Sequence, residues 1–482
     1  MRQKHRDMLP GFFHDCCAGG TVVASAAQDE SSTKVPQIVQ QYREEYKRID
    51  EQLQKYPEIL EAVHRDLQKL CKPDAVRDRR PDFTTENLFR AILVMQIEAV
   101  PYREAVVRIA ESRTLQNFCR LTKKETVNHT LLCSAFNAIT PETWQTINQL
   151  YAIRMKQEEK INIDNIRTDT TVVESNIHYP TDSSLLWDTY RTIDRLWTRA
   201  IDLGLSPVLP DFRFHPKKIR KLHLTIVRFA TSKGGRRKQL VKSSYKTLIE
   251  RTSEALTKAK EIAMCLKMSN SIIAVGLGVE LASYFPAMEK VVDAASRRYA
   301  GENVPVEDKV FSIFESHTEL VQRGKRDKPI EFGHKIVLSQ TVEKFITDYD
   351  VFLRSPSDTK LLENVVERHH ELFQKYPSGV AADMGFHPGK DEFDALVDEY
   401  DEKVQYFGVP GRLCEFGETL MSTFQRWRAG IEGTISCLKR VFRLARCHFK
   451  GFKNFCSGVG SAIFCHNMLT MVRHEMAPPA TE

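Results

Sequence analysis

The chain has 482 residues, of which 42% are hydrophobic and 28% charged, and its formal net charge at pH 7 is +7. At one domain per roughly 100–200 residues, such a chain should contain about three domains with large cores. Its eleven cysteines are odd in number and lack a repeating spacing, which argues against a disulfide framework and for a reducing compartment. No apolar run approaches the roughly 18 residues of a membrane span, so we expect a soluble protein with no membrane partner.

Positive charge is concentrated in two blocks. Lysine and arginine residues recur from Arg426 to Lys450 against Glu432 alone. The stretch from Asp211 to Lys242 holds one acid and eleven cations: Arg213, Lys217, Lys218, Arg220, Lys221, Arg228, Lys233, Arg236, Arg237, Lys238 and Lys242. Phosphate neutralisation and counterion release reward such local clusters, which favours a polyanionic partner. Either block taken alone is as typical of a solvated helix face.

Residues 1–32 carry no periodic pattern and are expected to form a loose tail. Residues 33–158 follow a helical period, and Thr84 or Thr85 is a natural N-cap for a helix that continues to Met95. Pro101 begins a second helix, and short helical patterns follow at 115–119 and 130–139. This group of short helices favours a helix-turn-helix DNA-binding domain, although other helical bundles have the same pattern.

Residues 159–182 have a different pattern. They predict a strand with Asp169 near its end, because apolar residues recur among polar ones at Ile161, Ile163, Ile166, Val172 and Val173. From 183 to 305 the helical period returns, in 185–201, 248–266 and 288–299. We expect residues 183–305 to form an inserted helical unit that contains the first basic block.

Strand patterns resume in residues 306–475. Strands are predicted at 309–314 and 331–338, joined by a hairpin with a basic tip at 323–329. A helix at 360–376, a strand at 380–383, a helix at 391–400, a strand at 403–408 and a long helix at 424–442 follow. Without the insertion, the order is three strands and then helix, strand, helix, strand, helix. This order predicts an α/β, ribonuclease-H-like mixed sheet with flanking helices, formed by residues 159–182 and 306–475.

Three acids occupy informative places in this order. Asp169 ends the first strand, Asp383 ends the strand after the first helix, and Glu432 lies in the final helix. Open sheets place ligands beyond the carboxyl ends of their strands, and neighbouring strands lie about 4.8 Å apart, so two such acids can share a cation. Asp164 competes with Asp169 because the alternation slips inside the first strand.

Carboxylates without a histidine match hard divalent cations. Asp169, Asp383 and Glu432 are therefore predicted to bind Mg²⁺ or Mn²⁺ rather than zinc. Two such ions about 3.5–4 Å apart serve phosphodiester cleavage, because they activate the attacking water or hydroxyl and stabilise the leaving oxygen. The expected cofactor is a pair of Mg²⁺ or Mn²⁺ ions.

The final helix carries a cation on either side of its acid. Arg428, Glu432 and Lys439 project from one side because offsets of four and seven are close to whole turns. This spacing is typical of a metal ligand flanked by phosphate contacts, although an ordinary surface salt-bridge ladder has it too. Gly430 and Gly433 each cost a helix about 1 kcal/mol relative to alanine, which indicates close approach of another backbone or of a nucleic-acid strand.

Several blocks, in this order, carry a family resemblance: Asp169–Leu186, His317–Leu320, Glu331–Lys335, Ala382–Phe386 and Arg428–Ser436. Over roughly residues 84–470 the chain resembles bacterial insertion-sequence transposases of the DDE superfamily. The tyrosine, arginine, glutamate and lysine signature of related transposases is matched at Arg428, Glu432 and Lys439. Gln425 takes the tyrosine position.

The resemblance implies an enzyme that cuts DNA at the ends of a mobile element and joins the freed 3′ hydroxyl to target DNA. Its catalytic metal ligands would be Asp169, Asp383 and Glu432, and Arg428 and Lys439 would hold phosphates of the element ends. The implied partner is double-stranded DNA, the implied assembly a homodimer on DNA, and the implied location the nucleoid in the bacterial cytoplasm. Further DNA contacts are expected at Gln425, Lys217, Lys218, Arg236, Arg237 and Lys238.

Two other functions stay open. One is a structure-selective DNA nuclease on the same ribonuclease-H-like fold, and the other is an inactive, element-derived DNA-binding protein. Three histidines are expected to be structural donors rather than DNA contacts: His178, His317 and His334. Two tryptophans are expected in the core of the insertion, Trp187 and Trp197, and an adjacent pair is expected on a helix surface, His369 and His370.

Overall fold

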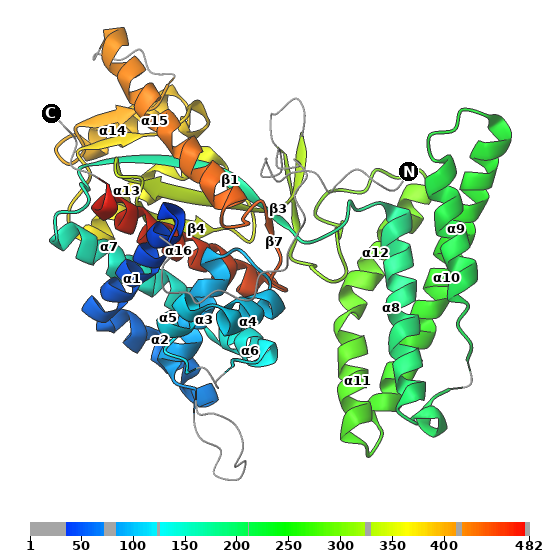
Figure 1. Cartoon of the computed structure of the whole chain (residues 1–482). Helices are drawn as coiled ribbons and strands as arrows, with labels where there is room; N and C mark the ends of the chain where they lie inside the picture. The colour runs from blue at the N-terminus through cyan, green and yellow to red at the C-terminus, as the bar shows by residue number, and fades with distance from the viewer. Residues whose placement is uncertain are drawn as a thin grey trace, which may run out of the picture. The chain divides into compact units, whose positions relative to one another are not determined.

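The computed structural model describes residues 35–71, 83–122, 126–210, 212–322, 329–410 and 417–477. The expected loose tail and most of the basic hairpin tip, residues 323–328, lie outside these ranges. The chain divides into two compact units after Glu44, within α1 (Gln37–Lys55), and the features below belong to the unit from Glu45 onward. Helices and a seven-stranded mixed sheet form the described part of the chain (Figure 1), which confirms the α/β class.

The helical pattern expected before the first strand is confirmed. The helices are α2 (Pro57–Cys71), α3 (Thr85–Ile97), α4 (Tyr102–Glu111), α5 (Arg113–Phe118), α6 (His129–Ala138) and α7 (Pro141–Gln157). Thr84 caps α3 as predicted: its hydroxyl accepts the Asn87 N–H at 3.2 Å, and the Asn87 side chain accepts the Thr84 N–H at 2.8 Å. Such reciprocal capping satisfies two of the amide groups that a helix start leaves without intrahelical partners.

The sheet is built around β1 (Asn165–Ser175). Its antiparallel neighbour β3 (Ile330–Gln340) pairs in turn with β2 (Glu319–Gln322) and with β4 (Ile346–Val351), both antiparallel. On the other edge of β1, β5 (Gly379–Ala381) pairs in parallel and is followed by the parallel β6 (Tyr406–Gly408). A two-residue strand, β7 (Arg446–Cys447), pairs with the far end of that edge.

Several strand assignments differ from the sequence-based prediction, which did not include β2, β4 or β7. Residues 309–314 are not a strand, because the Ser312 hydroxyl accepts the Phe314 and Glu315 N–H groups and turns the chain. The third strand is instead β4. The sequence-based prediction missed β4 because acidic residues recur along it. Asp348 on β4 is neutralised by Arg368, which donates to both carboxylate oxygens at 2.6 and 2.7 Å.

The helices that follow β4 agree with the prediction in order, and their bounds shift by a few residues. They are α13 (Leu362–Phe373), α14 (Lys390–Tyr400) and α15 (Gly417–Arg440), with short 3-10 turns at Asp358–Lys360 (η2) and Met384–Phe386 (η3). One core joins α13, α14 and the sheet through Ile166, Val366, Phe386, Phe393 and Phe407. The apolar side of α15 is buried at Ile431 and Leu438.

A helix that the sequence-based prediction missed, α16 (Phe452–Met476), packs against α3, α7 and β4. A methyl group at Gly460 would lie 2.8 Å from the Trp144 Cβ atom of α7. Together with Ile272–Tyr299, α16 has the length and apolar composition of a membrane span, against our expectation that no segment would. Of the apolar window in α16, 89% is buried inside the protein, so α16 is apolar because it is a core helix.

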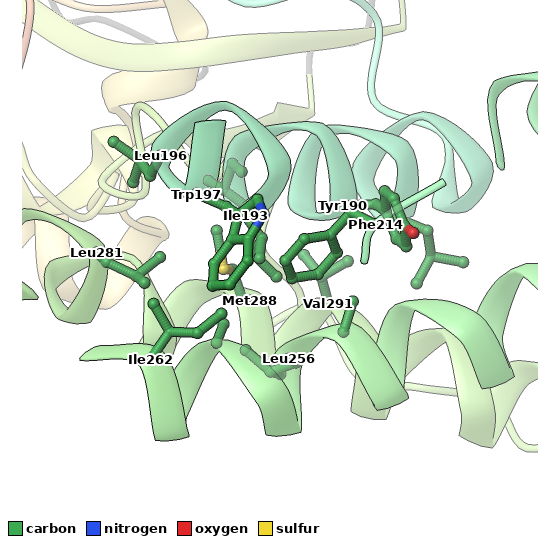
Figure 2. Close-up of a cluster of buried hydrophobic side chains, with 14 of the residues drawn as sticks. Tyr190, Ile193, Leu196, Trp197, Phe214, Leu256, Ile262, Leu281, Met288 and Val291 are labelled. Atoms are coloured by element: carbon green, nitrogen blue, oxygen red, sulfur yellow. The ribbon is translucent and has the colours of Figure 1, made fainter. Parts of the chain in front are cut away.

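The inserted unit is helical, as predicted, and comprises α8 (Asp182–Asp202), α9 (Pro216–Phe229), α10 (Gly235–Lys267), α11 (Ile272–Ser283) and α12 (Phe285–Tyr299). Figure 2 shows its core, in which Ile193 and Trp197 of α8 meet Leu256 and Ile262 of α10 and Met288 of α12. Trp197 is buried there and Trp187 packs partly buried against the same cluster, so both tryptophans are core residues, as expected.

Candidate active site

Asp169 lies in the middle of β1, not at its end as the sequence suggested. It is nevertheless beside an open stretch of the sheet edge, because β5 pairs with β1 only at residues 165–167 and β7 only at 174–175. Between these two points, the described residues provide no strand on this edge of β1. The Thr170 N–H donates to the Asp169 carboxylate at 2.7 Å, and 13% of the Asp169 side chain is exposed.

Asp383 follows β5 directly after the buried Ala382, at the end of the strand as predicted. Its carboxylate caps the η3 turn by accepting the Gly385 N–H at 2.9 Å. Because β5 runs parallel to β1 and ends beside Arg167, the chain leaves the strand along the open edge on which Asp169 lies. The parallel pairing thus brings the two carboxylates to the same part of the sheet.

Glu432 reaches this region from α15, and its side chain is 65% exposed. Arg428, one turn earlier, lies between the acids: its guanidinium is 3.5 Å from an Asp169 oxygen and 3.4 Å from a Glu432 oxygen. Gln425 is tied to the strand ends, since its amide donates to the Gly408 carbonyl at 2.9 Å and accepts from the Arg428 Nε at 3.3 Å. These bonds use both ends of the Gln425 amide within the protein, and its expected DNA contact stays a prediction.

The three acids influence one another electrostatically. Burial, followed by repulsion from Asp383, raises the pKa of Asp169 to about 6, and Glu432 also raises it, while the Thr170 N–H and Arg428 lower it. Within the described ranges, however, no three acid, histidine or cysteine side chains converge closely enough to enclose a metal ion. Both findings are consistent, because charge repulsion acts over longer distances than metal coordination.

The donor set fits a hard divalent cation. Its members are carboxylates without a histidine, the ligand type that Mg²⁺ and Mn²⁺ prefer. Burial and then repulsion from Asp383 raise the pKa of Asp169, and a bound cation relieves such repulsion. Asp169, Asp383 and Glu432 are therefore the residues suited to hold such ions. The competitor Asp164 is directed elsewhere, because its carboxylate pairs with Lys375 at 2.6 Å.

A fourth acid, Asp358, lies beside the site and was missed by sequence reasoning. Its carboxylate accepts from the Thr170 hydroxyl at 3.3 Å and from Lys335 Nζ at 2.9 Å. A methyl group at Gly385 would be 3.6 Å from Asp358 and 3.0 Å from Asp383, which places both carboxylates around one glycine. Asp358 lies in a polar loop without periodicity, so no local pattern indicated it. Its partner Lys335 was named only as the last residue of the block Glu331–Lys335.

The first basic block is surface-exposed at the residues expected to contact DNA. Lys217 and Lys218 lie in the first turn of α9, and Arg236, Arg237 and Lys238 in the first turn of α10. The guanidinium of Arg237 lies 5.5 Å from the ring centre of Phe229, the last residue of α9. Lys439 is half-buried in the last turn of α15.

The expectation that three histidines are structural is confirmed. His317 Nδ1 lies 2.7 Å from His334 Nε2, His334 bonds the Phe352 carbonyl, and His178 pairs with Asp188. The expected surface position of His369 is wrong, because that side chain is buried and its burial lowers its pKa to about 4.

Comparison with known proteins does not place the chain in a family. No protein-family model, curated protein or solved structure matches it.

Proposed function

We propose that this protein is a metal-dependent DNA transposase with a ribonuclease-H-like catalytic domain. The observation that carries the proposal is that three acids from three elements lie within electrostatic reach of one another: Asp169 from the central strand, Asp383 from the end of its parallel neighbour, and Glu432 from the helix that follows the sheet. Burial and the repulsion from the neighbouring acids raise the pKa of Asp169, which gives the site an electrostatic reason to bind divalent cations.

The topology of the sheet supports the fold assignment. Along the order β4–β3–β1–β5–β6 the first three strands are antiparallel and the last two join β1 in parallel. In the chain, α13 precedes β5, α14 precedes β6, and α15 follows. This strand order and helix placement support the proposed ribonuclease-H-like domain, with α8–α12 as an insertion after the first strand.

The chemistry follows from these residues. Mg²⁺ or Mn²⁺ ions held by Asp169, Asp383 and Glu432 would supply an activated nucleophile and a stabilised leaving oxygen. Water attacks a phosphodiester at the element end, the bond from phosphorus to the 3′ oxygen breaks, and that oxygen takes a proton to become the 3′ hydroxyl. This hydroxyl then attacks a target phosphodiester and loses its proton, while a 3′ oxygen of the target strand leaves. Arg428 and Lys439 would hold the phosphates in place.

The proposed partner is double-stranded DNA, contacted also by the exposed cations of α9 and α10. Because two element ends must be joined in concert, we propose a homodimer on DNA in the bacterial cytoplasm. The sharpest test uses duplexes that carry the inverted repeats flanking the gene, assayed for strand cleavage and for joining to a second duplex with Mg²⁺ or Mn²⁺.

In that assay Asp383→Asn is expected to lower cleavage and joining by a thousandfold or more while end binding stays within a few-fold. Asp164→Asn is the matched control, because Asp164 is paired with Lys375 away from the other acids, and it should keep near-normal activity. Cleavage without joining would favour the structure-selective nuclease, and binding without cleavage the inactive DNA-binding protein. Nicking retained by Asp383→Asn would refute the site assignment.

A further inference from the structure

The proposed function leaves open what fixes the position of α15, which supplies both Arg428 and Glu432. Its inner face meets the sheet at positions three and four residues apart, where Trp427, Gly430 and Thr434 follow one another along the helix. Residues with this spacing share one side of a helix. The contacts at these positions are mainly polar, which is unusual for a helix packed on a sheet.

Arg167 is the centre of these contacts. It lies on β1 two residues before Asp169, and side chains two apart on a strand point to the same face. The residue is 4% exposed. Its guanidinium donates to the Trp427 carbonyl at 2.7 Å and to the Gln340 side-chain oxygen at 3.0 Å, and it lies 5.5 Å from the Trp427 ring centre.

Gly430 makes this approach possible. A Cβ atom at this position would lie 2.1 Å from Arg167 Nη1 and 2.9 Å from its Cζ, distances that non-bonded atoms do not tolerate. The guanidinium cannot yield easily, because two hydrogen bonds and a ring contact hold it. Glycine is a poor helix former, so its presence inside α15 is explained by the close approach of Arg167.

A second polar contact reinforces the first. Gln340, directly opposite Arg167 in the β1–β3 register, donates to the Thr434 hydroxyl at 2.5 Å. Gln340 and Thr434 are both buried. Two neighbouring strands are thus bound to one face of α15 by directional bonds, which fix the height and rotation of a helix more narrowly than apolar contacts do.

We propose that Arg167, Gln340 and Thr434, with the space left by Gly430, form a clip that sets the position of Glu432 and Arg428 over Asp169. These are positioning residues, and the inference rests on the proposed function. Removing one bond or filling the space shifts α15 relative to β1, and a displacement of about 1 Å is enough to cost a hundredfold in rate. If Arg167 did not position α15, an apolar side chain of similar volume could replace this buried cation.

The chain offers a matched pair of variants. Gly430→Ala fills the space beside Arg167, whereas Gly433→Ala, on the same helix, meets open space and gains the same helix propensity. We expect Gly430→Ala to weaken Mn²⁺ binding, measured without DNA, at least tenfold and to lower kcat for cleavage at least a hundredfold. Gly433→Ala should keep Mn²⁺ binding within about threefold of wild type. Thr434→Val should lower kcat about tenfold, and Thr434→Ser, which keeps the hydroxyl, should restore it.

The readouts separate the clip from the proposed function. Amide hydrogen exchange reports on α15 without metal or DNA, and Gly430→Ala should speed exchange in residues 424–440 where Gly433→Ala does not. A wild-type protein that neither binds Mn²⁺ nor cuts DNA would overturn the proposed function, even if the exchange result holds. Equal Mn²⁺ affinity in the two glycine variants, or a lower melting temperature with unchanged kcat per folded molecule, would overturn the clip.

Discussion

The inserted helices and the contact between α15 and the sheet are stabilised by different forces. The insertion is organised around apolar side chains from five helices, such as Ile193, Leu256 and Met288, and its stability depends on buried apolar area. The contact between α15 and the sheet depends on single polar groups, such as Arg167 and Gln340. Apolar packing tolerates small shifts, whereas directional bonds define one geometry. The difference matches their proposed tasks, because binding a DNA surface requires a scaffold and catalysis requires fixed distances.

The largest stability effect should come from the insertion. Trp197→Ala removes the indole from the centre of its core and is expected to cost roughly 3–5 kcal/mol, measured by urea denaturation. Trp187→Ala is the matched control on the same helix, because Trp187 is only partly buried and should cost clearly less. If the two variants lost equal stability, apolar burial would not be what organises the insertion.

At the candidate site, replacing a charged residue should raise the free energy of unfolding rather than lower it. The pKa of Asp169 is about 6 rather than the ordinary 3.8, so the folded protein holds a proton between these values that the unfolded chain has lost. Stability therefore falls as pH rises from about 4 to 6, and the cost is fully present above pH 6. Asp169→Asn should raise the free energy of unfolding there by up to about 3 kcal/mol, since one pKa unit is worth about 1.36 kcal/mol.

Two controls accompany the Asp169→Asn variant. The gain from Asp169→Asn should vanish below about pH 4, and Asp164→Asn should show none at either pH in parallel melts without metal. Adding Mg²⁺ should raise the melting temperature of wild type and leave Asp169→Asn unchanged. An Asp169→Asn protein no more stable than wild type at pH 7.5 would mean that burial and the neighbouring acids do not raise the pKa of Asp169.

The smallest stability effect should come from the surface of the insertion. Replacing Arg236 and Lys238 with alanine is expected to change the free energy of unfolding by less than about 0.5 kcal/mol, because both side chains are exposed. DNA affinity should fall, and the slope of log affinity against log salt should decrease by about 0.9 for each DNA phosphate that the variant no longer neutralises. An unchanged slope would mean that α10 is only a scaffold and that Arg236 and Lys238 do not neutralise DNA phosphates.

Features that depend on neighbouring residues in sequence were predictable. The N-cap at Thr84 and the insertion helices α8, α10 and α12 follow from local residue patterns. The site residues stay a prediction, but the strand and helix that carry Asp383 and Glu432 could be assigned by counting along the chain. The same counting placed Asp383 correctly at the end of β5.

What escaped prediction depends on distant partners. The acids of β4 are compatible with a strand only because Arg368 neutralises Asp348, and Asp169 reaches the site from mid-strand only because β5 is short. Asp358 carries no local signal, since its neighbour Lys335 comes from another strand. Helix α16 is buried on every side and therefore has no amphipathic period to reveal it.

The position of α16 also has a consequence for synthesis on the ribosome. The Asn148 side chain of α7 donates to the Gly460 carbonyl across 312 residues of chain, so α7 emerges long before its packing partner exists. At about 5–20 residues per second, the interval is roughly 15–60 s, during which Trp144 and Phe464 cannot meet. Nascent chains of this protein should therefore depend on chaperones that shield exposed apolar surface until translation has passed α16.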